Sequence, residues 1–120
     1  VAKATADAVV GTGPDLVTLV AMGWAGVTRT DEDEQCALYL RNLIEGRQSN
    51  PDHVRGMIMA GKESQKFGDP KTPYFHPQDR DIALRIDAAP FAIVIEEENG
   101  LLVARAKNGT EVFDPAMLCG

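Results

Sequence analysis

The stretch FAIVIEEENGLLVARAKNG, residues 91–109, restricts the fold more than any other part of the chain. Two runs rich in β-forming residues flank Asn99-Gly100, a pair that tolerates the positive φ angles of a two-residue type I′ turn. The pattern therefore predicts a C-terminal antiparallel hairpin near residues 91–107. A second Asn-Gly pair, at 108 and 109, predicts a further turn into a short strand at 111–113.

A different strand signal lies near the start of the chain. Residues 16–22, LVTLVAM, form a nearly continuous apolar run with β-branched members. Such a run is typical of a strand that is covered on both faces. We therefore expect a central parallel strand near residues 16–22.

Helical patterns fill most of the remaining sequence. They cover residues 1–10, about 31–45, 51–60 and 77–87, with a surface loop at 63–75. Thr30 is the expected N-cap of the second helix, with Asp33 as the capping-box acid, and Cys36 is expected in the core. Asn50 is the expected cap of the third. This order of elements predicts an α/β fold: a single domain over residues 1–120, built as a three-layer α/β/α arrangement with a mixed sheet.

Charge and composition exclude some classes of partner. The net charge is −6, the pI is about 4.8 and the basic residues are scattered, so we expect no nucleic-acid partner. No apolar run approaches the roughly 18 residues of a membrane span. The two cysteines lie far apart without a CxxC pair. These features favour a soluble protein of the reducing cytoplasm.

The strongest candidate site joins a glycine-rich turn to a run of acids. Gly23, Trp24, Ala25 and Gly26 follow the predicted strand, and four acids, Asp31 to Glu34, begin the next helix. Ligands of open α/β sheets bind at the carboxyl ends of the strands. There the carboxylates would suit Mg²⁺, and the amides of the turn would suit an anionic substrate. The alternative is structural, because acids in a first turn offset the helix dipole.

Other polar residues are weaker candidates. Lys62, Ser64 and Lys66 would meet an anion, although such a segment is equally typical of a solvated linker. His53 and His76 stand at helix starts, where capping or surface roles are common. Trp24 either lines a site or covers the sheet edge.

Three stretches, GPDLVTLVAMGWAG, DEDEQCALYLRNLIEG and PQDRDIALRIDAAPFAIVIEEENGLLV, occur in an order and spacing that resembles the second half of the 2-phosphosulfolactate phosphatase family. In this resemblance Glu32-Asp33 matches the family's acidic pair and Cys36-Ala37 its following CA. Asp79 and Asp87 match two aspartates that bracket a later helix. A DVLRA-like strand of the family's first half has no counterpart here, and the chain has no initiator Met. We therefore expect the carboxyl-terminal part of a longer phosphatase.

The resemblance implies Mg²⁺-dependent hydrolysis of (R)-2-phospho-3-sulfolactate to sulfolactate and phosphate, a step of coenzyme M biosynthesis. Glu32 and Asp33 would be the catalytic and metal-binding residues, and the turn of Gly23 to Gly26 would bind the substrate. The expected partners are the small anionic substrate and either a second copy or the missing amino-terminal half. The alternative is a non-catalytic binding or assembly module that pairs through its acidic surface and hairpin edge.

Overall fold

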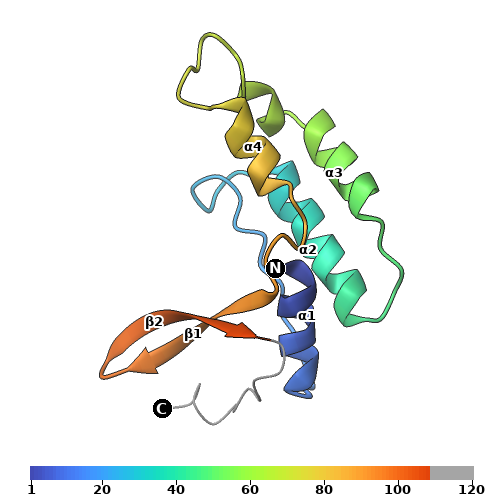
Figure 1. Cartoon of the computed structure of the whole chain (residues 1–120), viewed down its shortest axis with the longest axis vertical. Coiled ribbons are helices and arrows are strands. Elements are labelled where there is room, and N and C mark those ends of the chain that lie inside the picture. The colour runs from blue at the N-terminus through green and yellow to red at the C-terminus, as the bar shows by residue number, and fades with distance from the viewer. Residues whose placement is uncertain (109–120) are drawn as a thin grey trace. The chain divides into compact units, whose positions relative to one another are not determined.

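The computed structural model describes residues 1–108, which form four α-helices, one 3₁₀ helix and a two-stranded hairpin (Figure 1). The mixed α and β content predicted from the sequence is confirmed. The chain divides into two compact units. Among the described residues, the first consists of residues 1–17 and 87–108, and the second of residues 18–86. None of the described helices has the length and apolar character needed to cross a bilayer.

The hairpin of the first unit has the predicted position and turn. Strands β1 (Phe91–Glu98) and β2 (Leu101–Asn108) pair antiparallel, with Phe91 opposite Asn108 and Glu98 opposite Leu101. Asn99 and Gly100 have φ angles of 53° and 78°, the left-handed values that a type I′ turn requires. The hairpin prediction is confirmed, whereas the predicted second turn and the strand at 111–113 lie outside the described residues.

Helix α1 (Ala2–Gly11) packs against β1. The buried residues on these elements are all alanines, namely Ala4, Ala6 and Ala92, and their small side chains allow the backbones to approach closely. Asp87 accepts a hydrogen bond of 2.8 Å from the backbone N–H of Lys3. A carboxylate at this position satisfies an unpaired amide of the first turn and complements the helix dipole.

The two faces of the hairpin differ in character. On the face that carries Ala92, Arg105 binds both carboxylate oxygens of Glu98 at 2.6 and 2.7 Å, and Lys107 pairs with Glu96 at 3.1 Å. The opposite face is mainly apolar and exposed, with Ile93, Ile95, Leu102, Ala104 and Ala106. This apolar hairpin face has no partner within the described residues.

Glu98 makes the stability of the hairpin depend on pH. The hydrogen bonds from Arg105 hold the pKa of Glu98 below its ordinary value of about 4.5. Stabilisation of this kind is present above the unfolded-state pKa and is lost as the pH falls through the folded-state pKa. We expect the thermal midpoint to fall as the pH is lowered from about 6 to 3, and Glu98→Gln to flatten that dependence. Glu97→Gln is the control, since Glu97 has no ion pair within residues 1–108. Equal flattening by both variants would contradict this account.

The second unit contains helices α2 (Asp31–Ile44) and α3 (Pro51–Ala60), which lie alongside each other (Figure 1), followed by the 3₁₀ helix η1 (Glu63–Lys66) and α4 (Pro77–Ala83). Asn50 caps α3, since its Oδ1 accepts hydrogen bonds from the amides of Asp52 and His53 at 2.9 and 3.2 Å. The helices predicted at 31–45 and 51–60 are therefore confirmed to within a residue.

The segment 16–22 is not a strand in this structure. Its residues make no backbone hydrogen bond to another described segment, and Leu16, Val20 and Met22 are 83, 69 and 67% exposed. A strand needs a hydrogen-bonded neighbour, and the only strands within residues 1–108 pair with each other. Neither the central parallel strand nor the three-layer arrangement is seen.

Three local predictions were also wrong. The buried apolar residue of α2 is Tyr39, whereas Cys36 is exposed. Helix α4 ends at Ala83 rather than near Asp87, and Ile82, which was expected in its apolar stripe, is exposed. The expected surface loop contains η1, and Ser64 within it is buried.

Candidate functional site

The turn after residue 22 is a narrow loop bridged by its own backbone. The N–H of Trp24 donates to the carbonyl of Thr28 at 2.8 Å, and the N–H of Thr28 donates back to Trp24 at 3.1 Å. Gly23, Ala25 and Gly26 all have positive φ angles, of 67°, 52° and 68°. The amides of Ala25 and Gly26 donate to no acceptor within the described residues. Both residues are exposed, so these two amides are open to solvent.

The side chain of Asp33 stabilises this turn and does not cap the N-terminus of its own helix. Its Oδ2 accepts a hydrogen bond of 2.5 Å from the N–H of Gly23. Thr30 is the N-cap of α2, but its side chain caps no amide, and its buried Oγ1 has no hydrogen-bond partner in the described part of the chain. The predicted capping box is therefore wrong, because the Asp33 carboxylate binds the amide of Gly23, ten residues earlier in the chain.

Glu32 and Asp33 line different pockets of the second unit. Asp33 lines a pocket of about 150 Å³ between residues 19–22 and the Cys36, Ala37 and Leu40 side of α2. Although Cys36 is exposed as a residue, partial loss of solvation raises the pKa of its thiol there, and the charge of Asp33 raises it further. Glu32 lines a second pocket of about 170 Å³. Successive residues of a helix point about 100° apart, so neighbouring acids reach different surroundings.

The pocket beside Glu32, which we call the Glu32 pocket, joins charged and apolar side chains from all four helical segments of the second unit. Its polar members are Glu32, Glu63, Ser64, Lys66 and Arg80. Its apolar members are Ile58, Phe67, Phe75, Ala83 and Leu84. Within the described residues Glu32, which is half-buried, makes no hydrogen bond and no ion pair.

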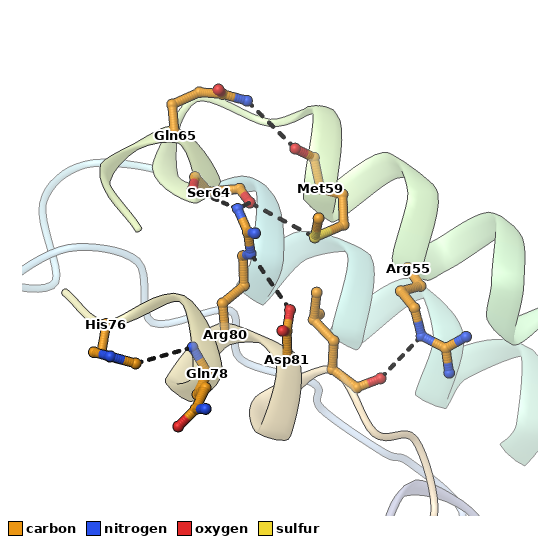
Figure 2. A network of polar contacts seen from close by, with 9 residues as sticks. Arg55, Met59, Ser64, Gln65, His76, Gln78, Arg80 and Asp81 are labelled. Carbon is orange, nitrogen blue, oxygen red and sulfur yellow. Dashed lines mark hydrogen bonds and ion pairs between the residues drawn. The ribbon is translucent and has the colours of Figure 1, made fainter. Parts of the chain in front are cut away.

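Arg80 is fixed in this pocket by one end of its guanidinium group. Nη1 donates to the carbonyl oxygen and to Oγ of Ser64 at 3.2 and 3.3 Å, as Figure 2 shows. Nε is buried and donates to no described acceptor. Its ion pair with Asp81 spans 3.9 Å, which is too long for a hydrogen bond. The Arg80 side chain is only 22% exposed.

Lys66 lies among three aromatic rings. Its Nζ is 4.6 Å from the ring centre of Phe75, 5.5 Å from that of Trp24 and 5.9 Å from that of Phe67. The same ammonium pairs with Glu63 at 2.7 Å. These contacts bring the Gly23 to Gly26 turn, through Trp24, next to the Glu32 pocket.

The structure thus brings together only part of the site predicted from the sequence. Glu32, Ser64 and Lys66 share one pocket, with Trp24 beside Lys66. The backbone amides of Gly23 and Trp24 are already engaged, and Asp33 points elsewhere. His53 is exposed and belongs to neither of these two pockets. His76 caps α4, with its Nδ1 accepting from the amide of Gln78 at 3.3 Å (Figure 2).

Sequence reasoning missed Arg80. One signal was present, since Ala83 and Leu84 follow at the i+3 and i+4 positions and all three line the pocket. An arginine on the apolar side of a short helix needs a polar partner, and here that partner is Ser64.

The donor set limits how Mg²⁺ can bind. No group of three or more His, Cys, Asp and Glu side chains within residues 1–108 is placed to hold a metal ion. Mg²⁺ is commonly held by one or two carboxylates together with waters and substrate phosphate oxygens. Glu32 alone fits that mode, whereas a shared site of Glu32 and Asp33 does not fit their separate pockets.

Comparisons with known proteins give no assignment. No protein-family model, curated protein or solved structure matches the chain. The functional argument therefore depends on the geometry of the residues themselves.

Proposed function

We propose that the chain is the carboxyl-terminal part of a cytoplasmic Mg²⁺-dependent phosphatase, which hydrolyses a small phosphorylated hydroxy acid. The observation that carries this proposal is the Glu32 pocket, where a carboxylate without an ion pair shares a small cavity with Arg80 and with the ion pair of Lys66 and Glu63. Phosphoryl transfer needs positive charge around the phosphate and a carboxylate for the metal. The resemblance in sequence makes (R)-2-phospho-3-sulfolactate, an intermediate of coenzyme M biosynthesis, the first substrate to test.

Each part of the site has a separate role in this proposal. Glu32 holds Mg²⁺, and the bound metal supplies stabilisation of the charge that develops on the phosphoryl oxygens. The free amides of Ala25 and Gly26 orient the substrate oxygens. Asp33 fixes the turn that carries these amides. Lys66, paired with Glu63, holds its ammonium group beside Trp24 of the turn.

The same proposal accounts for the exposed segment at residues 16–22. A preceding portion of the protein would supply a strand beside it and complete a three-layer α/β/α arrangement in which these residues are central and parallel. The exposed apolar side chains of Val20 and Met22 support this, because adjacent exposed apolar side chains usually mark a surface that another part of the protein or a partner covers.

Removal of the metal is expected to slow phosphate release from (R)-2-phospho-3-sulfolactate by the full-length protein. Excess EDTA should lower the initial rate at least about tenfold, since a Mg²⁺ ion supplies several kcal/mol of charge stabilisation. Added Mg²⁺ should restore the rate, and a colorimetric phosphate assay measures both. An unchanged rate in EDTA would contradict the proposed role of Mg²⁺.

A second candidate function is assembly, and the apolar hairpin face favours it. Leu102 is 79% exposed there, and both hairpin edges lack a strand partner among the described residues. Unpaired edges and apolar sheet faces are common docking surfaces. In this alternative the acidic chain is a non-catalytic module that pairs with a second copy or with an amino-terminal half.

Sedimentation measures assembly directly. The alternative predicts that the 120-residue chain self-associates at roughly 0.1 mM, and that Leu102→Lys raises the dissociation constant at least about tenfold. Ile82→Lys is a matched control, because Ile82 is also exposed but lies in the other unit. A monomeric wild-type chain, or equal effects of both variants, would count against assembly through the hairpin.

A further inference from the structure

The turn of the hairpin contains a chemically labile pair, Asn99-Gly100. The backbone nitrogen of the residue after an asparagine can attack the asparagine Cγ atom, and glycine hinders this attack least because it has no Cβ atom. A bond from the glycine nitrogen to Cγ forms, the bond from Cγ to Nδ2 breaks, and the side-chain nitrogen leaves as ammonia. Water then opens the cyclic imide at either carbonyl, which gives aspartate or isoaspartate. Water is the only co-reactant.

The structure leaves both reacting groups of this pair open. Asn99 and Gly100 are exposed. Within residues 1–108 the N–H of Gly100 donates no hydrogen bond, and the side chain of Asn99 makes none. No contact in the described chain therefore protects the Asn99 amide from attack.

Asn42 and Asn50 lack these features and provide internal comparisons. Asn42 lies within α2 and precedes Leu43, whose side chain hinders the approach of its own backbone nitrogen. Asn50 precedes Pro51, which has no N–H, and its Oδ1 accepts two hydrogen bonds at the start of α3. Both should therefore keep their side-chain amides far longer than Asn99.

Opening of the hairpin at its turn end would allow the reaction. This end is closed by the ion pair of Glu98 and Arg105, while Leu101 and Leu102 beside the turn are 67 and 79% exposed. Two-stranded hairpins are marginally stable, and segments with few buried contacts open locally. Opening releases Asn99 from its φ of 53° and lets the nitrogen of Gly100 reach Cγ.

The two products affect the hairpin differently. Aspartate followed by glycine is compatible with a type I′ turn, so this product keeps the turn. Isoaspartate has one more carbon atom in the backbone, which lengthens a two-residue turn. The turn sets the register in which Glu98 lies opposite Leu101, so the longer backbone disrupts the pairing of β1 and β2.

We propose that Asn99 is a site of spontaneous deamidation, and that its conversion to isoaspartate disrupts the pairing of β1 and β2. The reaction is slow and irreversible, and it changes the first unit alone. It depends on neither the phosphatase activity nor the assembly proposed above.

Peptide mapping of the 120-residue chain after prolonged incubation in neutral buffer tests the site. Trypsin cleaves after Arg85 and Arg105, so the peptide of residues 86–105 contains Asn99 alone, and Asn108, which also precedes glycine, falls in another peptide. We expect Asn99 to convert at least about tenfold faster than Asn42 or Asn50. No conversion of Asn99 in the folded chain, while a synthetic peptide of residues 86–105 converts, would overturn the proposal.

Two variants test the route through the open hairpin. Glu98→Gln weakens the ion pair with Arg105, so it should accelerate conversion of Asn99 at least about twofold. Glu97→Gln is the matched control and should leave the rate unchanged, because Glu97 has no ion pair within residues 1–108. Equal rates in the two variants would contradict this route.

NMR spectra of the separated products test the structural consequence. The isoaspartate form should lose the dispersed amide signals of β1 and β2, whereas the Asn99→Asp variant should keep them. Unchanged strand signals in the isoaspartate form would refute the proposed effect on pairing.

Discussion

The Glu32→Gln variant of the full-length protein is expected to lose phosphatase activity and keep its stability. Glu32 has no hydrogen bond or ion pair in the described chain, so its neutral analogue removes no structural contact. The metal would lose its carboxylate ligand from this chain. We expect kcat/KM to fall at least about 100-fold, which corresponds to about 2.7 kcal/mol of transition-state stabilisation. Surface changes of this kind alter stability by about 0.5 kcal/mol or less, so Tm should stay within a few degrees.

Asp33→Asn is the matched comparison, because the neighbouring acid has a structural contact. Its carboxylate accepts the amide of Gly23 at 2.5 Å, and a neutral amide oxygen is a weaker acceptor. Asp33→Asn should therefore lower Tm more than Glu32→Gln does. Wild-type activity in Glu32→Gln would mean that this acid only starts the helix. A large fall in Tm for the same variant would show a structural contact instead of a catalytic one.

Gly23→Ala is expected to disrupt the turn beside the site. A Cβ atom at position 23 would lie 2.2 Å from the carbonyl oxygen of Thr28, and the backbone has a φ of 67°. The left-handed conformation alone costs an alanine about 1 to 2 kcal/mol, and the backbone contact adds strain that no side chain can relieve. We expect the free energy of unfolding of the second unit to fall by about 3 kcal/mol or more, measured by urea denaturation.

Gly26→Ala separates the two causes. Gly26 has nearly the same φ, 68°, but a Cβ there would meet no atom within 4 Å. It should therefore lose only the conformational contribution of about 1 to 2 kcal/mol. Equal losses at both positions would mean that the bridge between Trp24 and Thr28 does not constrain Gly23.

Local chemistry was sufficient to predict the elements whose hydrogen bonds close within a few residues. Asn99-Gly100 specifies its turn by tolerating positive φ at both positions. Asn50-Pro51 specifies the start of α3, because the Asn side chain satisfies the first amides and Pro lacks one. These predictions need no knowledge of the rest of the chain.

The strand predicted at 16–22 failed for the opposite reason. An apolar run shows that a segment should be covered, but its pairing depends on a neighbour elsewhere in the protein. In the described chain β1 and β2 pair with each other, and nothing pairs with these residues. The coarse mixture of helix and strand was therefore predictable, whereas the layer arrangement was not.

In the candidate site, too, the sequence indicated residues that are close along the chain but not the contacts that folding creates between distant residues. Sequence position selected Glu32 and Asp33 as a pair, although helix geometry turns them into separate pockets. Arg80 was missed because its anchor, Ser64, lies 16 residues away and is brought close only by the fold. That Glu32, Asp33 and the Gly23 to Gly26 turn bind a metal ion and a substrate remains a hypothesis.

The most direct test of the central claim is a crystal structure of the full-length protein with Mg²⁺ and sulfolactate. The account predicts a Mg²⁺ ion bonded to a carboxylate oxygen of Glu32 at about 2.0 to 2.1 Å, with the ligand in the Glu32 pocket. A metal ion and ligand bound at another position, with Glu32 facing only solvent, would contradict it.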